Sequence, residues 1–193
     1  MPLHVGKKGI RALGIAESFR KGGRFSWLVG VVMRGDLLID GFGVERVTVG
    51  GRDATEKVVS LVRGMGREDI NLIFLSGCVI SWFNVVVLPR VYEELRIPLI
   101  CLTYEESEGL EKYFREYFPE DYEERIKAYR LNGEREELTL KTGLKVYVRY
   151  LGVSRREVEL LLNRWTLTGR YPEPVRVAKL LARTLLRYHG GDG

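Results

Sequence analysis

The chain has 193 residues and a formal net charge of +5, with 45% hydrophobic and 30% charged residues. This composition supplies a sizeable core and excludes a disordered or low-complexity protein. No apolar run approaches the roughly 18 residues that cross a bilayer. No apolar block like that of a signal peptide follows Lys7 and Lys8, so we expect a cytoplasmic protein that does not bind a membrane.

Three consecutive strands are predicted at the start of the chain, over residues 11–19, 25–34 and 37–49. Short turns that contain glycine separate them, which is typical of antiparallel hairpins. Gly50-Gly51 ends this pattern. Asp53, followed by Glu56 three residues later, resembles the capping box of a helix that runs to about Arg63.

Strands and helices alternate in the rest of the chain. The apolar runs 71–75 and 98–103 predict central strands that are buried on both faces. Between them we expect a loop over 77–83 and a helix over 84–95 that is bent near Pro89. Two charged amphipathic helices follow, over 108–118 and 121–131. A hairpin of strands 137–140 and 146–150 comes next, and two further helices cover 154–165 and 175–188. Ser154 and Glu157 form a capping box.

Strands joined by hairpins and then strands joined by helices indicate a mixed sheet. We therefore expect one α/β domain over residues 1–193 with a ribonuclease-H-like sheet. Three antiparallel strands are followed by two parallel strands, with helices on both faces. Right-handed crossovers place the fourth strand beside the first. The site is expected at the carboxyl ends of these two strands, which brings residues 16–18 beside 76–78.

The charges are unevenly distributed along the chain. Residues 1–35 hold seven Lys or Arg and one acid, residues 138–191 hold eleven and three, and residues 36–137 hold 13 basic and 21 acidic residues. Either the two basic ends meet as one basic face that binds nucleic acid, or Lys and Arg only solvate helix surfaces. The absence of glutamine beside abundant Glu, Lys and Arg favours a thermophilic source.

Cysteine chemistry is not favoured by the sequence. Cys78 and Cys101 both lie in apolar surroundings without metal-ligand spacing, so we expect reduced core residues. The only histidines, His4 and His189, lie near the termini. We therefore expect no histidine beside Cys78 to activate it as a nucleophile.

Five runs of sequence carry a resemblance to a known family: RALGIAESF, DGFGVERVTVGGRDATE, LSGCVISWFNVV, IPLICLTYEESEGLE and TGRYPEPVRVAKLLART. They resemble the archaeal domain-of-unknown-function family number ninety-nine, which is similar to endonuclease V. Endonuclease V cleaves beside deaminated purines with Mg²⁺ held by three carboxylates. The resemblance implies an ancestor that processed nucleic acid, and Mg²⁺ as the candidate cofactor.

The resemblance does not carry the three carboxylates over intact. The aspartate of the first strand falls on Ala16 and the aspartate of the fourth strand on Ser76. The second carboxylate corresponds to Asp53 or Glu56. Glu17 is the only acid of the first strand, and it points to the opposite strand face from residue 16. Glu17 and Asp53 are therefore candidate catalytic and metal-binding residues. The alternative for Glu17 is an ion-paired acid at a strand end, and the alternative for Asp53 is a helix N-cap.

The remaining family positions are also altered. The basic residue expected after the fifth strand falls near Thr103-Tyr104, and the late histidine falls near Gly169-Arg170. Five residues are candidates for nucleic-acid contact: Arg52, Trp82, Asn84, Arg170 and Arg176.

Each of the five contact candidates has a structural alternative. Arg52 follows two glycines at a helix start, where anions bind. Trp82 either stacks on a base or packs on a helix, and Asn84 either reads a base edge or caps a helix. Arg170 and Arg176 are candidates for phosphate contact. The alternative for Arg176 is an ion pair with Glu173 at helical spacing.

Three hypotheses follow. The first is a protein that binds DNA or RNA, of endonuclease V ancestry, with a degenerate or rebuilt catalytic centre. The second is a metal-dependent endonuclease that uses Glu17, Asp53 and Glu105 or Glu106. The third is a protein-interaction module that binds a protein partner through the acidic middle of the chain.

Overall fold

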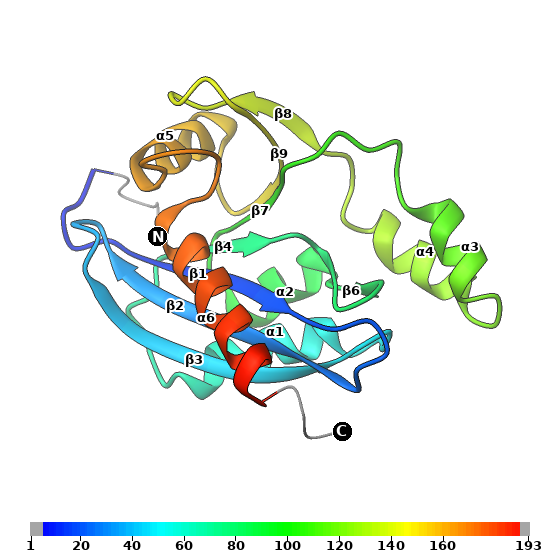
Figure 1. Cartoon of the computed structure of the whole chain (residues 1–193). Helices are drawn as coiled ribbons and strands as arrows, with labels where there is room; N and C mark the ends of the chain where they lie inside the picture. The colour runs from blue at the N-terminus through cyan, green and yellow to red at the C-terminus, as the bar shows by residue number, and fades with distance from the viewer. Residues whose placement is uncertain (1–5, 190–193) are drawn as a thin grey trace.

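The computed structural model describes residues 6–189 and is built around one mixed sheet (Figure 1). The strands of this sheet are β1 (Arg11–Ser18), β2 (Phe25–Arg34), β3 (Ile39–Thr48), β4 (Leu72–Ser76), β7 (Leu99–Thr103), β8 (Glu136–Thr139) and β9 (Lys145–Leu151). They form a seven-stranded sheet in the order β3-β2-β1-β4-β7-β9-β8.

The strand pairing confirms the expected ribonuclease-H-like sheet. Strand β2 is antiparallel to both β1 and β3, while β4 is parallel to both β1 and β7. The fourth strand therefore lies beside the first, as right-handed crossovers predict. The last hairpin extends the sheet, because β9 pairs antiparallel with β7 and carries β8 at the edge.

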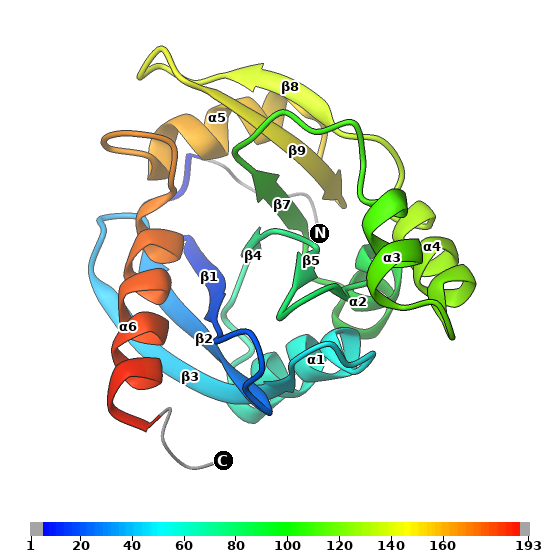
Figure 2. The same cartoon turned by 45° about the vertical axis from the view of Figure 1, so that its right-hand side comes forward.

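Helices cover both faces of the sheet (Figure 2). The helices α1 (Ala54–Gly64) and α2 (Leu88–Leu95) share one buried cluster with alternate residues of the central strands. The helices α5 (Arg155–Trp165) and α6 (Glu173–His189) pack on the opposite face. The pair α3 (Glu111–Tyr117) and α4 (Tyr122–Arg130) lies beside the sheet, where Phe114 and Ile126 pack on Val85.

The two central strands are apolar because both of their faces are covered. Ile73 of β4 belongs to the cluster on the α1 side, whereas its neighbour Phe74 packs edge-on against Trp165 of α5, with ring centroids 6.3 Å apart. Each such large side chain contributes roughly 1.5–3 kcal/mol when it is fully buried. This explains why the run 71–75 shows no alternation of apolar and polar residues.

Gly14 allows α6 to lie directly on β1. A Cβ atom at Gly14 would lie 2.2 Å from the carbonyl carbon of Pro174. Only glycine permits this backbone approach. The contact fixes the start of α6 over the middle of β1, so the next turns of α6 run towards the carboxyl end of that strand.

The structure corrects several element boundaries. The helix expected over 108–118 begins at Glu111. The helix expected over 84–95 begins at Leu88, because Asn84–Val85 forms the short strand β6, which pairs with β5 (Val79–Ile80). Pro89 lies in the first turn of α2, where a missing N–H costs nothing, and does not bend the helix. The last helix begins at Glu173 rather than at residue 175.

The capping box, the search for membrane-spanning helices and the two histidines can each be compared with the sequence expectations. The capping box of Ser154 and Glu157 is confirmed, since both of its hydrogen bonds are present at the start of α5. Within residues 6–189, no helix is both long and apolar enough to cross a membrane. His4 lies outside the described residues, and His189 packs edge-on against Trp27.

Candidate functional site

The carboxyl ends of β1 and β4 lie side by side. The parallel register pairs Ile15 with Leu75, so the next residues, Ala16 and Ser76, are neighbours at this edge. Ala16 is buried against α6. The sheet therefore brings together the two positions at which the resemblance to endonuclease V implies carboxylates, and neither residue can bind a cation through a carboxylate.

Glu17 is the acid at this edge of the sheet. Its Oε1 accepts a long hydrogen bond of 3.4 Å from the Ser81 amide, while its Oε2 is buried without any hydrogen-bond partner. Burial raises the pKa of Glu17, and the Ser81 amide and the charge of Lys179 oppose that rise. A buried carboxylate oxygen without a partner costs folding free energy, so its presence calls for an explanation beyond folding.

Lys179 reaches the same edge from α6. Its side chain is half-buried, and its Nζ lies 4.9 Å from the ring centroid of Tyr171. Desolvation lowers the pKa of Lys179, as does the neighbouring charge of Arg183, while Glu17 opposes the shift. Among residues 6–189, no carboxylate lies within ion-pair distance of Lys179.

Tyr104 follows β7 and supplies another polar group without a partner. Its hydroxyl is buried and faces Ser76, but no hydrogen bond of normal geometry forms between them. Burial raises the pKa of Tyr104. The ring packs on Tyr171, with centroids 4.3 Å apart. The hydroxyl therefore remains protonated at neutral pH and is available as a donor to a ligand.

A cavity of about 360 Å³ lies beside Tyr104 and Lys179, at the carboxyl ends of β4 and β7. Its wall includes Ser76, Cys78, Tyr104, Arg149 and Lys179. A larger groove of about 800 Å³ between the α3–α4 pair and the β8–β9 hairpin shares Arg149 with it. Lys179 links the cavity to Glu17, because it lines the cavity and its charge acts on the carboxylate. The position agrees with the edge at which ligands bind open α/β sheets.

Asp53 has a structural role away from this cavity. Its carboxylate accepts hydrogen bonds from the Thr48 hydroxyl at 2.8 Å and from the Asn84 amide group at 2.7 Å. Asp53 occupies the N-cap position of α1, but its side chain makes no cap hydrogen bond, so the expected capping box with Glu56 is wrong. Glu56 instead forms an ion pair with Arg90.

Asn84 caps α1 in place of Asp53. Its Oδ1 accepts a hydrogen bond of 3.0 Å from the Ala54 amide, and its Nδ2 donates to the Thr48 carbonyl as well as to Asp53. Asn84 has no exposed surface. It therefore offers no edge to a nucleic-acid base in this conformation, contrary to one of its two sequence interpretations, and it caps α1 rather than the helix that follows it.

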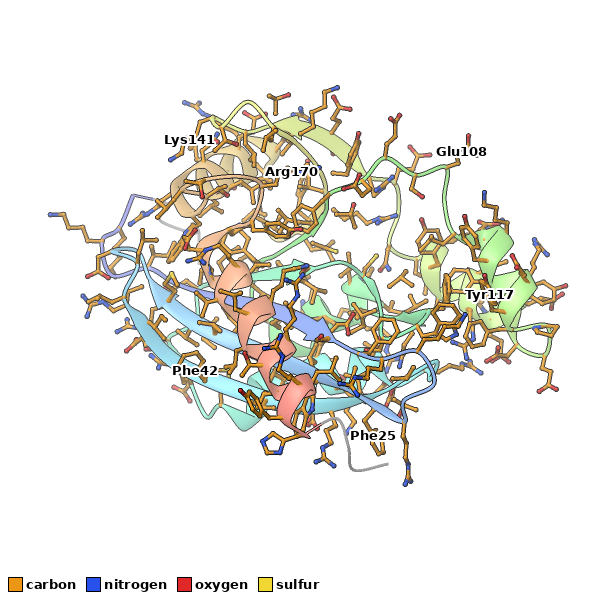
Figure 3. All side chains as sticks on the ribbon, in the orientation of Figure 1. Phe25, Phe42, Glu108, Tyr117, Lys141 and Arg170 are labelled. Atoms are coloured by element: carbon orange, nitrogen blue, oxygen red, sulfur yellow. The ribbon has the colours of Figure 1, made fainter. Side chains whose placement is uncertain are left out.

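Trp82 lies in a turn of left-handed backbone, in which Ser81, Trp82 and Phe83 have φ of 47°, 60° and 61°. Its ring centroid lies 5.0 Å from that of Tyr117 on α3, and the Lys21 Nζ lies 4.4 Å from the same ring. The structure thus supports the packing interpretation of Trp82, whose ring remains half-exposed. Figure 3 shows Tyr117 on the α3 side of the molecule.

The three arginine candidates all have protein partners. Arg52 pairs with Glu124 of α4. Arg170 donates to the Tyr104 carbonyl and lies 3.6 Å from Glu105, in the upper part of the view in which Tyr117 lies at the right (Figure 3). Arg176 holds Glu173 with hydrogen bonds of 2.7 and 2.9 Å, which is the ion-pair alternative predicted from their spacing.

The residues do not fit a three-carboxylate Mg²⁺ centre. Within residues 6–189, no group of three or more His, Cys, Asp or Glu is placed to hold a metal ion. Asp53 is saturated by hydrogen bonds, and the side chain of Glu105 is 86% exposed beside Arg170. Of these three acids, Glu17 is the one that keeps a buried carboxylate oxygen without a partner. The structure thus does not assemble Glu17, Asp53 and Glu105 around one cation.

Comparison with known proteins identifies the family. The sequence profile of the family described as Endonuclease dU matches residues 8–186. The chain belongs to the Endonuclease dU family. It is 34% identical to a UPF0215 protein of Pyrobaculum calidifontis, over 91% of this chain and 97% of that relative. It is 33% identical to a UPF0215 protein of Archaeoglobus fulgidus, over 93% and 94%.

Solved structures show that the fold is similar to that of endonuclease V. A protein of unknown function from Archaeoglobus fulgidus has a TM-score of 0.79 and 33% identity, with 91% of this chain and 98% of that chain covered. Human endonuclease V has a TM-score of 0.64 at 15% identity, covering 95% and 87%. Endonuclease V of Ciona intestinalis, solved with DNA that contains inosine, has a TM-score of 0.63 at 12% identity, covering 94% and 87%. The Endonuclease dU family therefore shares its fold with endonuclease V.

Sequence reasoning missed three residues of the site: Tyr104, Arg149 and Lys179. No local motif marks them, because Tyr104 follows β7, Arg149 lies on β9 and Lys179 lies on α6. They line the same cavity only in the folded protein. The resemblance to endonuclease V implies a basic residue near the end of the fifth strand, and this sequence has Thr103 and Tyr104 there. A basic side chain reaches the same cavity from α6, as Lys179.

Proposed function

We propose that this protein binds a DNA or RNA strand across the carboxyl edge of β1, β4 and β7, and that its catalytic centre has been rebuilt around Glu17, Tyr104 and Lys179. One observation carries the proposal. The Tyr104 hydroxyl, buried without a partner, lines a cavity at the edge where the endonuclease V resemblance expects its site, and the buried Oε2 of Glu17, also without a partner, lies at the same edge beside Lys179. Such groups are retained against their folding cost where a ligand completes their hydrogen bonds.

The family description and the cavity together favour an extruded uracil base as the group that is recognised. A cavity of about 360 Å³ is within the range of small-molecule sites. Uracil presents two carbonyl oxygens, and Tyr104, Arg149 and Lys179 are donors in the cavity wall. Proteins that act on a base take it out of the stack into such a pocket.

Binding is tested by fluorescence anisotropy with a labelled single-stranded oligonucleotide that contains one deoxyuridine, and with its thymidine counterpart. We expect affinity to fall as salt rises, because phosphate contacts release counterions. We expect Lys179→Met to weaken binding by about tenfold, equivalent to about 1.4 kcal/mol. Lys57→Met is the matched control, because it removes the same charge from α1 on the opposite face.

Equal affinities of Lys179→Met and Lys57→Met would contradict the placement of the strand. No binding by the wild-type protein at low salt, or binding without any salt dependence, would contradict the function itself.

A second candidate function is cleavage of the strand at the bound deoxyuridine. The description of the family as an endonuclease favours it, as does the unpartnered oxygen of Glu17. Incubation of the deoxyuridine oligonucleotide with and without Mg²⁺ or Mn²⁺ measures the activity. We expect Glu17→Gln to abolish cleavage and Asp53→Asn to retain it, because Asp53 is committed to Thr48 and Asn84. Unchanged cleavage by Glu17→Gln would refute the role of Glu17.

A further inference from the structure

Cys78 lies in the wall of the cavity, just after β4. Its side chain is 2% exposed, so the cavity is the route by which a small ligand reaches the sulfur. The Arg149 Nη1 donates to the Cys78 Sγ at 3.5 Å. An arginine beside a thiol stabilises the thiolate, which is the nucleophilic form of cysteine. The sequence offered no histidine for this purpose, and the fold supplies Arg149 from β9 instead.

Arg149 is a buried cation without a carboxylate partner. It is 8% exposed, its Nε donates to the Gly133 carbonyl at 2.8 Å, and its guanidinium lies 5.5 Å from the ring centroid of Tyr129. Within residues 6–189, no Asp or Glu forms an ion pair with it. A buried charge requires compensation. The Cys78 sulfur accepts a hydrogen bond from Arg149 and can carry a compensating negative charge.

The neighbouring groups place the proton away from Cys78. The neighbouring Cys101 side chain on β7 is the largest influence that lowers the pKa of Cys78, and the charge of Arg149 and the Asn132 side chain act in the same direction, while burial opposes them. The hydrogen bond to Cys78 and burial raise the pKa of Cys101. The pKa of Cys78 is thus lower than that of Cys101.

A second feature marks the cavity as a ligand site rather than a packing defect. The Tyr104 hydroxyl in its wall is buried without a hydrogen-bond partner, and Lys179 lines it without an ion-pair partner among the described residues. Both can donate to an oxygen that gains negative charge during a reaction. The cavity therefore holds a nucleophile on one wall and donors on another.

We propose that Cys78 is a nucleophile that adds reversibly to carbon C6 of a pyrimidine base held in the cavity. This proposal rests on the proposed function, because that function brings the base to the cavity. Uracil is a conjugated ring that thiolates attack at C6, so it is an electrophile of suitable chemistry for such a site.

The addition balances without an oxidant or a reductant. A lone pair of the Cys78 sulfur forms the S–C6 bond, the C5–C6 π pair shifts towards C4, and the C4 carbonyl pair becomes the lone pair of an enolate oxygen. C5 then takes a proton from solvent, which gives a saturated 5,6-dihydro adduct. Loss of a C5 proton and expulsion of the thiolate regenerate the base.

The nucleophile itself is tested by alkylation with iodoacetamide over a pH series, followed by peptide mass mapping. We expect Cys78 to react in the folded protein with a midpoint at lower pH than in the urea-unfolded chain, where both thiols behave as free cysteines. Arg149→Met should move that midpoint to higher pH. Preferential alkylation of Cys101, or the same midpoint in the folded and unfolded chains, would overturn the proposal.

The reaction with the base is tested in D₂O with the deoxyuridine oligonucleotide. Reversible addition exchanges the C5 hydrogen for deuterium, which mass spectrometry detects, while thymidine has no C5 hydrogen to exchange. We expect exchange with the wild-type protein, none with Cys78→Ser, and retained exchange with Cys101→Ser, which keeps a donor beside Cys78. Bound oligonucleotide without exchange would overturn this proposal alone, whereas no bound oligonucleotide would overturn it together with the proposed function.

Discussion

Two polar clusters flank the turn at residues 81–83, and they differ in how their hydrogen bonds are completed. In the Asp53 cluster, the carboxylate, Asn84 and Thr48 satisfy one another. Arg125 of α4 closes the cluster by donating to the carbonyls of residues 50, 51 and 83. In the Glu17 cluster, one oxygen of Glu17 and the Tyr104 hydroxyl are buried without partners.

The difference separates a structural role from a functional one. A buried polar network that is fully satisfied fixes loops and makes a fold specific, and it leaves nothing for a ligand to bind. Buried groups without partners lower stability and persist only where something else requires them. We therefore assign Asp53 to ordering the loops around α1, and we propose Glu17, Tyr104 and Lys179 as the site.

The largest effect is expected from Arg125→Met, which breaks the closure of the Asp53 cluster. Arg125 is 6% exposed and donates to three backbone carbonyls as well as to Asp121. Its loss leaves buried acceptors unpaired, so we expect the free energy of unfolding to fall by about 3 kcal/mol. Denaturant unfolding followed by circular dichroism measures this.

Arg130→Met is the matched control for Arg125 on the same helix. Arg130 pairs with Glu111, but its side chain is 65% exposed. We expect its replacement to change stability by less than about 1 kcal/mol, since exposed ion pairs contribute little. Equal losses in the two variants would show that the buried network does not distinguish Arg125.

A smaller loss is expected from Asp53→Ala. The change leaves the Asn84 amide and the Thr48 hydroxyl without their shared acceptor, which we expect to cost roughly 2 kcal/mol of unfolding free energy. The same unfolding experiment checks it. A neutral or stabilising outcome would remove the basis for assigning Asp53 to folding.

The smallest effect, and one of opposite sign, is expected from Glu17→Gln. Because the pKa of Glu17 is raised in the folded protein, the folded chain binds more protons than the unfolded chain at pH values between the two pKa values. Wild-type stability therefore falls as pH rises through that window. Gln removes the ionisation, so the variant should gain stability relative to wild type at pH 8 and much less at pH 4.

Unfolding curves of Glu17→Gln and wild type at both pH values measure this dependence. A variant that is less stable than wild type at pH 8 would indicate that the Glu17 carboxylate is satisfied in the fold, as Asp53 is. The comparison of the two clusters would then fail.

The sequence was sufficient for the framework of the fold because the relevant signals are local. The bounds of β2, the capping box at Ser154 and the order of hairpins and crossovers all follow from short stretches of chain. The parallel register then placed Ala16 beside Ser76. These features depend on period, turns and handedness, which tertiary contacts reinforce here.

The candidate site was only partly predictable from the sequence. The sequence predicts that Glu17 lies at the sheet edge where β1 and β4 end. For Asp53 it leaves two interpretations open, a helix N-cap and a metal ligand. Whether its carboxylate bonds its own helix or Thr48 depends on Asn84, which lies 31 residues further along the chain. Lys179 and Arg149 reach the cavity from a helix and a strand whose positions local patterns do not specify.

The measurement that tests the central claim most directly is the affinity of Lys179→Met and Asp53→Ala for the deoxyuridine oligonucleotide at one fixed salt concentration. The account predicts that Lys179→Met weakens binding by about tenfold, and that Asp53→Ala, although less stable, binds within about twofold of wild type at a temperature where it is folded. Weakened binding by Asp53→Ala with unchanged binding by Lys179→Met would contradict the account.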